Sequence, residues 1–135
     1  MKKILVIDGQ GGKIGSAVIE RIKAEVPIQE IYAIGTNSFA TAAMLRSGAD
    51  YAATGENPVK VNCLNADIII GPMGIISANS LLGEVTPAMA MAIGQSSAIK
   101  VLLPLNKCNL LVVGLTDRSF PDLISLAVKQ ESALL

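Results

Sequence analysis

Short apolar runs recur along the chain and predict strands at residues 3–7, 30–34, 50–53, 67–70 and 99–103. These runs are continuous and do not alternate with polar residues, which is typical of parallel strands that are covered on both faces. Another apolar run, 110–114, follows the fifth strand after a short turn at 105–108. A link this short cannot carry a parallel crossover. We therefore expect a sixth, antiparallel strand at the edge of the sheet.

The segments between these runs have apolar residues at helical spacing. They predict helices at 13–25, 39–47, 58–65, 75–82, 87–93 and 121–131. Pro27 ends the first helix, and Thr86-Pro87 has the capping pattern that opens a helix. Strands that alternate with helices indicate right-handed crossovers and a mostly parallel sheet. We expect an α/β, three-layer Rossmann-like fold with strand order 3-2-1-4-5 and the antiparallel strand six beside strand five, as one domain over residues 1–135.

The composition favours an aliphatic core and self-association. The 135 residues are 51% hydrophobic, only 3% aromatic and only 16% charged. Because so few polar residues are available to cover the surface, we expect an apolar patch that meets a second copy in a homo-oligomer. A sheet covered on both faces would account for part of the same composition.

Several classes of partner and site are disfavoured. Eleven basic and eleven acidic residues balance, and no basic run is present, so nucleic acid is not expected as a partner. No apolar run approaches the roughly 20 residues that cross a bilayer, and Asp8 interrupts the first run too early for a signal peptide. We expect a cytoplasmic protein with no membrane partner. Cys63 and Cys108, without any histidine, predict no zinc or iron site.

A glycine-rich turn follows the first strand. Gly9, Gly12 and Gly15 are spaced G-x-x-G-x-x-G, with Gly11 as an additional glycine. Such a turn exposes main-chain amides at the positive end of the next helix, where they attract a phosphate group. The sequence thus predicts a nucleotide or phosphate site at Asp8, Gly9, Gln10, Gly11, Gly12, Lys13, Ile14 and Gly15. The alternative is that the glycines only tighten a β–α turn.

This turn resembles that of the dihydrodipicolinate reductases and of the extended short-chain dehydrogenases, which bind NAD or NADP. The resemblance implies NADP or NAD as the cofactor. In the reductases a basic residue occupies the place of Lys13 beside the phosphate, so the resemblance makes Lys13 a candidate phosphate contact.

Two further loops belong to the predicted site. The second strand ends in Gly35-Thr36-Asn37, without the carboxylate that usually holds the ribose of NAD. This favours NADP, a mononucleotide or another phosphate ligand, with Thr36 and Asn37 bonding a ribose or a 2′-phosphate, or else only capping a helix. After the fourth strand, Gly71, Pro72, Met73 and Gly74 either line the ligand crevice or form an ordinary loop.

No group of side chains in the sequence predicts a reaction. Without histidine the usual catalytic triad is impossible. Asp8 ends the first strand and either shapes the turn, which we favour, or holds a ribose, water or a metal-bound phosphate. Glu56 and Glu84 either approach a ligand from their loops or are solvated loop carboxylates, which are commoner. Cys108 is expected to be an unreactive thiol. The catalytic residues therefore stay unknown, and whether the protein is an enzyme is left open.

Strings along nearly the whole chain resemble an uncharacterised bacterial family of small Rossmann-like proteins, catalogued as a domain of unknown function. The strings are IDGQGG at 7–12, GTN at 35–37, TGEN at 54–57, GPMGII at 71–76 with Asn79-Ser80, GEVTP at 83–87 and PLNKCN at 104–109. This resemblance implies a fold but no activity. Our leading interpretation is a nucleotide-binding protein that prefers NADP to NAD. The alternative is a regulatory or assembly module that binds no small ligand and acts as a homo-oligomer.

Overall fold

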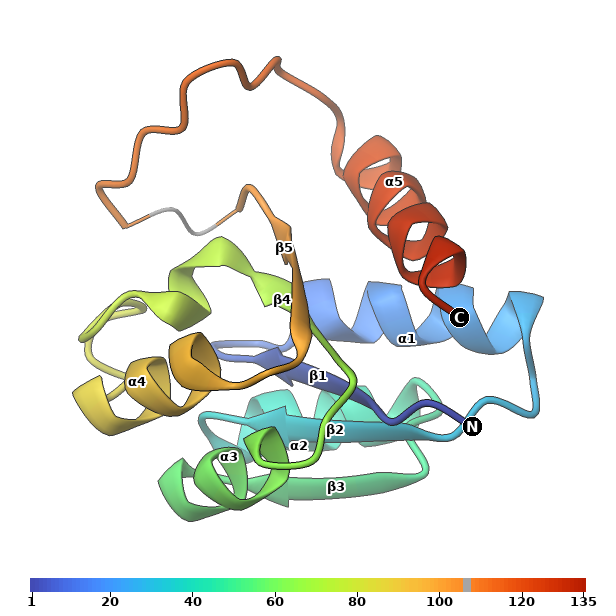
Figure 1. The fold of residues 1–135 in the computed structure, drawn as a ribbon, viewed down its shortest axis with the longest axis horizontal. Coiled ribbons are helices and arrows are strands. Elements are labelled where there is room, and N and C mark those ends of the chain that lie inside the picture. The colour runs from blue at the N-terminus through green and yellow to red at the C-terminus, as the bar shows by residue number, and fades with distance from the viewer. Residues whose placement is uncertain (106–107) are drawn as a thin grey trace.

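A parallel sheet forms the centre of the protein. The structure is a computed structural model that describes residues 1–105 and 108–135. Its five strands lie in the order β3-β2-β1-β4-β5, and every neighbouring pair is parallel (Figure 1). The strands are β1 (Ile4–Asp8), β2 (Ile31–Gly35), β3 (Tyr51–Thr54), β4 (Ile68–Pro72) and β5 (Ile99–Leu103). The predicted α/β class, the five parallel strands and their order are confirmed.

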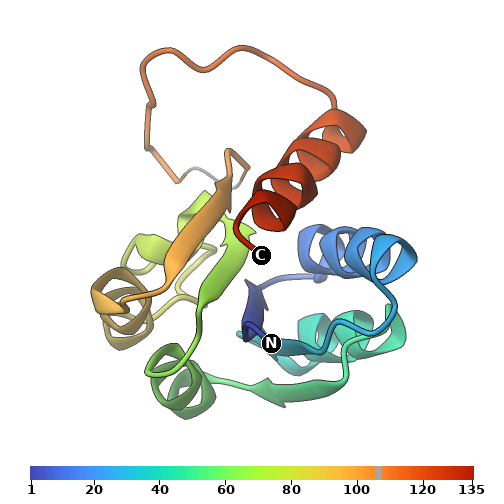
Figure 2. The ribbon, with the colours of Figure 1, turned by 45° about the vertical axis from the view of Figure 1, so that its right-hand side comes forward.

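Helices cover both faces of this sheet, giving three layers (Figure 2). One face carries α1 (Lys13–Glu25), α2 (Ser38–Arg46) and α5 (Phe120–Ala133). The other carries α3 (Glu56–Cys63) and α4 (Pro87–Gln95). The two hydrophobic cores are almost wholly aliphatic, because alternate residues of each strand point to opposite faces and both are covered.

Local sequence signals set the ends of the helices. Gly12 precedes α1 in the left-handed conformation, with φ of 73°. The Thr86 side chain accepts a hydrogen bond from the Met89 N–H at 3.1 Å and caps α4 as its sequence predicts. Ser119 caps α5 in the same way. These caps satisfy donors that the first turn of a helix leaves without an intrahelical partner.

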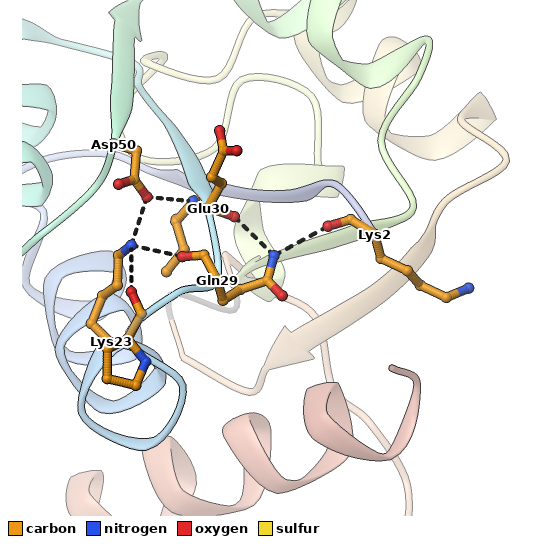
Figure 3. Close-up of polar contacts among 7 residues, drawn as sticks. Lys2, Lys23, Gln29, Glu30 and Asp50 are labelled. Carbon is orange, nitrogen blue, oxygen red and sulfur yellow. Dashed lines mark hydrogen bonds and ion pairs between the residues drawn. The ribbon is translucent and has the colours of Figure 1, made fainter.

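A polar network holds the amino-terminal ends of the strands, at the end of the sheet opposite the glycine turn (Figure 3). Lys23 Nζ donates to Asp50 Oδ2 at 2.7 Å and to the Gln29 carbonyl at 2.6 Å. The buried Gln29 amide in turn donates to the carbonyls of Lys2 and Glu30. The pKa of Asp50 is lowered, chiefly by the hydrogen bond from Lys23. These contacts hold the segments before β1, β2 and β3 together.

The prediction of a sixth strand at 110–114 is wrong. Residues 110–114 lie outside the sheet, whose five strands end with β5 as the edge. Of the turn predicted at 105–108, residues 106 and 107 are outside the described part of the chain. The apolar, β-branched composition of 110–114 expresses a strand propensity, but such a propensity depends on a neighbouring edge to pair with.

The helix predicted at 75–82 is also wrong. A short 3₁₀ helix, η1 (Met73–Ile76), is followed by turns in which Asn79, Leu81 and Leu82 all have positive φ. The loop closes on itself, since the Asn79 N–H donates to the Val85 carbonyl at 2.7 Å. Ser and Asn favour such local turns over helix interiors. The folded-back loop brings Glu84 to the glycine turn.

Candidate functional site

The glycine turn lies at the carboxyl end of β1, beside β4. The strand order reverses between these two strands, and ligands of open α/β sheets bind at this position. Within the turn, the Gly12 N–H donates to the Gly9 carbonyl at 2.9 Å, and Gln10 has a positive φ of 49°. The turn therefore has a defined, closed shape before any ligand is considered.

Asp8 occupies the inner side of the turn. Its buried carboxylate accepts hydrogen bonds from the Gly9 N–H at 2.8 Å and the Gly15 N–H at 2.7 Å. Burial raises the pKa of Asp8, and these hydrogen bonds, with a contribution from the Ile14 N–H, partly oppose that rise. Asp8 thus occupies two amides of the turn and has the turn-shaping role expected from its position.

Glu84 occupies a second side of the turn. Its Oε1 accepts hydrogen bonds from the Gln10 N–H at 2.8 Å, from Thr36 Oγ1 at 2.7 Å and from Asn37 Nδ2 at 2.7 Å. Burial acts to raise the pKa of Glu84, but the three hydrogen bonds together outweigh it, so the pKa lies below its usual value. A carboxylate is therefore present at the end of β2, supplied by the loop after β4.

A cavity of about 250 Å³ lies over the remaining, outer side of the turn. It is lined by residues 8–14 together with Leu105 and Phe120. Within residues 1–105 and 108–135, the N–H groups of Gly11 and Lys13 have no hydrogen-bond acceptor. The Lys13 ammonium lies 4.9 Å from the centre of the Phe120 ring. Two residues with unbonded amides, a lysine side chain and an aromatic residue therefore line one small cavity.

The turn glycines serve packing more than ligand access. A Cβ at Gly12 would lie 2.9 Å from Ala40 Cα in α2, and one at Gly15 would lie 2.6 Å from Met44 Sδ. A Cβ at Gly9 would lie 2.6 Å from Thr36 Oγ1, whereas one at Gly11 would meet no atom within 4 Å. Only Gly11 therefore leaves open space where a ligand could approach its amide.

The two other predicted loops, 35–37 and 71–74, do not line the cavity over the turn. Asn37 caps α2 by accepting a hydrogen bond from the Ala40 N–H at 2.9 Å, and Thr36 contacts Glu84. Gly71, Pro72 and Gly74 are buried beside β1, and Met73 is half-buried; none of the four lines the cavity over the turn. A Cβ at Gly71 would come within 2.3 Å of the Ile7 carbonyl oxygen, so this glycine permits close strand packing.

Sequence reasoning did not place Leu105, Phe120 or Glu84 at the turn. Glu84 lies 74 residues from Gln10 in the chain. Its only signal was its position in a loop after the fourth strand, at the same edge of the sheet. Leu105 and Phe120 flank the segment that was expected to form strand six. Because that segment was expected to join the sheet, the two residues were not expected to line one cavity.

Comparison with known protein families matches residues 3–135 to one family, described as a domain of unknown function, DUF3842. The chain belongs to the DUF3842 family. The resemblance seen in the sequence strings is thereby confirmed, and it extends over residues 3–135 of the chain. No curated protein gives a significant match.

One solved structure similar to this DUF3842 domain is a dodecameric FMN-dependent Ubix-like decarboxylase from Escherichia coli O157:H7. The identity is 12%, the TM-score is 0.43, and the match covers 94% of this chain and 91% of that one. The likeness concerns the α/β fold alone.

The described residues of this DUF3842 domain also bear on three other features, a metal site, a membrane span and a reactive thiol. Among residues 1–105 and 108–135, no group of three or more His, Cys, Asp or Glu side chains is arranged to hold a metal ion. In the same residues, every helix is too short or too polar to span a bilayer. Cys63 is buried, and burial raises its pKa to about 11, so this thiol is held in its protonated form.

Proposed function

We propose that this DUF3842 domain binds the phosphate group of a mononucleotide on the outer side of the glycine turn. The observation that carries the proposal is the pair of unbonded N–H groups of Gly11 and Lys13, two residues that line one cavity. Unbonded amides at the start of α1 and a lysine ammonium are donors that bind phosphate oxygens. The position at the switch in strand order supports the same assignment.

The arrangement of Glu84 favours a mononucleotide over NADP. A dinucleotide bound in the usual way extends its adenosine ribose to the end of β2. Here Glu84 already holds Thr36 and Asn37, the two side chains that could have bonded that ribose. A carboxylate there also repels the 2′-phosphate of NADP. NADP and NAD remain the predictions from the sequence pattern. NADP requires Glu84 to move away, and NAD requires its ribose to bond Glu84 in place of Thr36 and Asn37.

The walls of the cavity suit the rest of a mononucleotide. Leu105 and Phe120 form its apolar side, and a nucleobase or flavin ring could stack on the phenyl ring. At about 250 Å³, the cavity is smaller than the 300–1,000 Å³ typical of sites for drug-sized ligands. It therefore suits the phosphate end of a ligand whose ring extends outward. The proposed function is binding, with no reaction assigned.

The alternative of a module without a small ligand has one observation in its favour. Three of the turn amides, those of Gly9, Gln10 and Gly15, already bind the protein's own carboxylates. In this reading the turn is complete within the protein, and the cavity over Gly11 stays filled with water.

Calorimetric titration with AMP, FMN, NADP, NAD and inorganic phosphate tests the proposal. Gly11 offers a matched pair of variants, because a side chain there enters open space. Gly11→Asp adds a negative charge beside the amides, whereas Gly11→Asn adds a side chain of similar size without the charge. We expect a mononucleotide to bind the wild-type protein and to bind Gly11→Asp at least tenfold more weakly than Gly11→Asn. Equal affinities for the two variants, or no binding of any ligand at millimolar concentration, would contradict the proposal and favour the ligand-free module.

A further inference from the structure

An apolar segment between β5 and α5 stands away from the rest of the protein. We call residues 109–118 the arm; it is the orange loop at the top of Figure 1, and Figure 2 shows it separated from the sheet from a second direction. Leu111 and Val113 are fully exposed, and Val112 and Leu115 are nearly half exposed. Large apolar side chains gathered on one exposed segment mark an interaction site.

The backbone of the arm also lacks partners. Among the described residues, its one backbone hydrogen bond runs from the Leu115 N–H to the Val112 carbonyl at 3.5 Å. The sequence of 110–115, Leu-Leu-Val-Val-Gly-Leu, is rich in strand-forming residues. The arm thus has the side chains and the free backbone groups of a strand without a sheet to join.

Within the described part of the chain, the edge strand β5 lacks a pairing partner on one side. β5 pairs with β4 on one side, and its other side faces no strand in the described structure. An unpaired edge strand is a template for pairing with another chain. The opposite edge, β3, is a poorer template, since it has only four residues and two of them are alanines. Residues 110–115 in extended form reach about 20 Å, enough to cover the five-residue β5.

A hollow beside β5 shows that the arm does not fill its own edge. A cavity of about 330 Å³ lies between β5, the end of the arm and α5. Its apolar lining includes Val101, Leu103, Leu123 and Leu126. A second hollow separates the middle of the arm from Pro104 and Leu123. The segment that the edge could accept is therefore present in the chain but held away from it.

We propose that the arm of one copy adds to the β5 edge of a second copy, and that the second copy returns its own arm in the same way. Reciprocal exchange is the twofold-symmetric way to satisfy two identical arms and two identical edges. It also gives two matching contacts, which together can approach the roughly 800 Å² per partner of a stable interface. The balance of acidic and basic residues leaves no net charge to oppose this self-association.

The two ends of the arm connect this interface to the cavity over the glycine turn. Leu105 precedes the arm and Phe120 follows it, and both line that cavity. Exchange of arms would therefore place a second copy close to the mouth of the cavity. The inference itself rests on the arm and the β5 edge, and it stands whether or not a mononucleotide binds.

Disulfide cross-linking between two variants of the protein tests the exchange directly. In a Cys108→Ser background, which removes the exposed thiol and keeps the buried Cys63, one protein carries Val113→Cys and another carries Val101→Cys. After mixing and mild oxidation, we expect a disulfide-linked species of twice the mass that disappears on reduction. The double variant Val113→Cys/Val101→Cys is expected to cross-link between chains as well. A disulfide closed within single chains would show that the arm pairs with its own edge, and absence of any cross-link would also overturn the proposal.

Light scattering after size-exclusion chromatography supplies a second readout. Val113→Asp places a charge in the centre of the arm, and we expect it to reduce the molar mass to that of a monomer. The control Leu64→Asp makes the same change at an 80% exposed leucine beyond α3 and should leave the mass of the oligomer unchanged. A monomeric wild-type protein across the concentration range, or an oligomer that Val113→Asp leaves intact, would contradict the exchange.

Discussion

Removal of the Glu84 carboxylate should loosen the loop after β4 from the glycine turn. Glu84 Oε1 accepts three hydrogen bonds of 2.7–2.8 Å, from Gln10, Thr36 and Asn37. A hydrogen bond to a charged group contributes about 1.5–3 kcal/mol, and one between neutral groups about 0.5–1.5 kcal/mol. Glu84 is only half-buried, so water replaces part of what is lost and the sum of three bonds is an upper bound. We expect Glu84→Ala to lower the free energy of unfolding by about 2 kcal/mol.

Glu84→Gln separates the effect of charge from that of shape. Glutamine keeps one oxygen acceptor, so we expect a loss of about 1 kcal/mol. Urea denaturation at pH 7 measures both variants, with Glu20→Gln on the exposed face of α1 as the matched control, expected to change stability by less than about 0.5 kcal/mol. Equal stability of wild type, Glu84→Ala and Glu84→Gln would refute the idea that Glu84 holds the turn.

The pH dependence of the same variants gives an independent check. The pKa of Glu84 is lowered in the folded protein, below the 4.5 of an unperturbed glutamate. Its carboxylate therefore contributes stability that is fully present above that value and is lost as the pH falls through the folded pKa. We expect the stability difference between wild type and Glu84→Gln to shrink below about pH 4. A difference that stays constant from pH 7 to pH 3 would contradict this assignment.

Two further predictions concern the turn and the last helix. Gly12→Ala should lower the free energy of unfolding by about 2 kcal/mol or more, because φ is +73° and a Cβ would press on α2. Gly11→Ala should change it by less than about 1 kcal/mol, because a Cβ there meets no atom within 4 Å. Urea denaturation measures both variants, and equal effects would contradict the packing role of Gly12. Glu131 is buried in α5, and its Oε1 has no hydrogen-bond partner among the described residues. Burial raises the pKa of Glu131 in the folded protein. The free energy of unfolding therefore falls as the pH rises through the folded pKa. Glu131→Gln should therefore raise the free energy of unfolding at pH 8 by about 1 kcal/mol, and a destabilised variant would contradict this.

Local pattern was enough to predict most of the fold. The three central strands β1, β2 and β4 are buried apolar runs, and helix ends carry recognisable signals such as Thr86-Pro87, so both could be placed from the sequence. The predicted strand at 110–114 shows the limit of this reasoning, because strand propensity does not say where the partner edge lies. The residues prefer a strand, but the chain holds them away from its own β5 edge, which is unpaired among the described strands.

The candidate site was only partly accessible to sequence reasoning. The glycine turn could be recognised, because strand, glycines and helix follow one another directly. The hydrogen bonds that occupy its amides could not, since Glu84 reaches Gln10 through a loop that departs from helical structure at Asn79 and Leu81. The missing carboxylate at the end of β2 was read correctly from the chain, yet a carboxylate from another loop lies there in space. Contacts of this range depend on tertiary packing and leave no local pattern.

Amide chemical shifts measured while inorganic phosphate or AMP is added test the phosphate site most directly. The account predicts that the largest ¹H and ¹⁵N changes occur at the N–H groups of Gly11 and Lys13, and that they saturate. The N–H groups of Gly9 and Gly15, which bind Asp8, should change much less. Unchanged shifts at Gly11 and Lys13, or saturating changes confined to another part of the protein, would contradict the account.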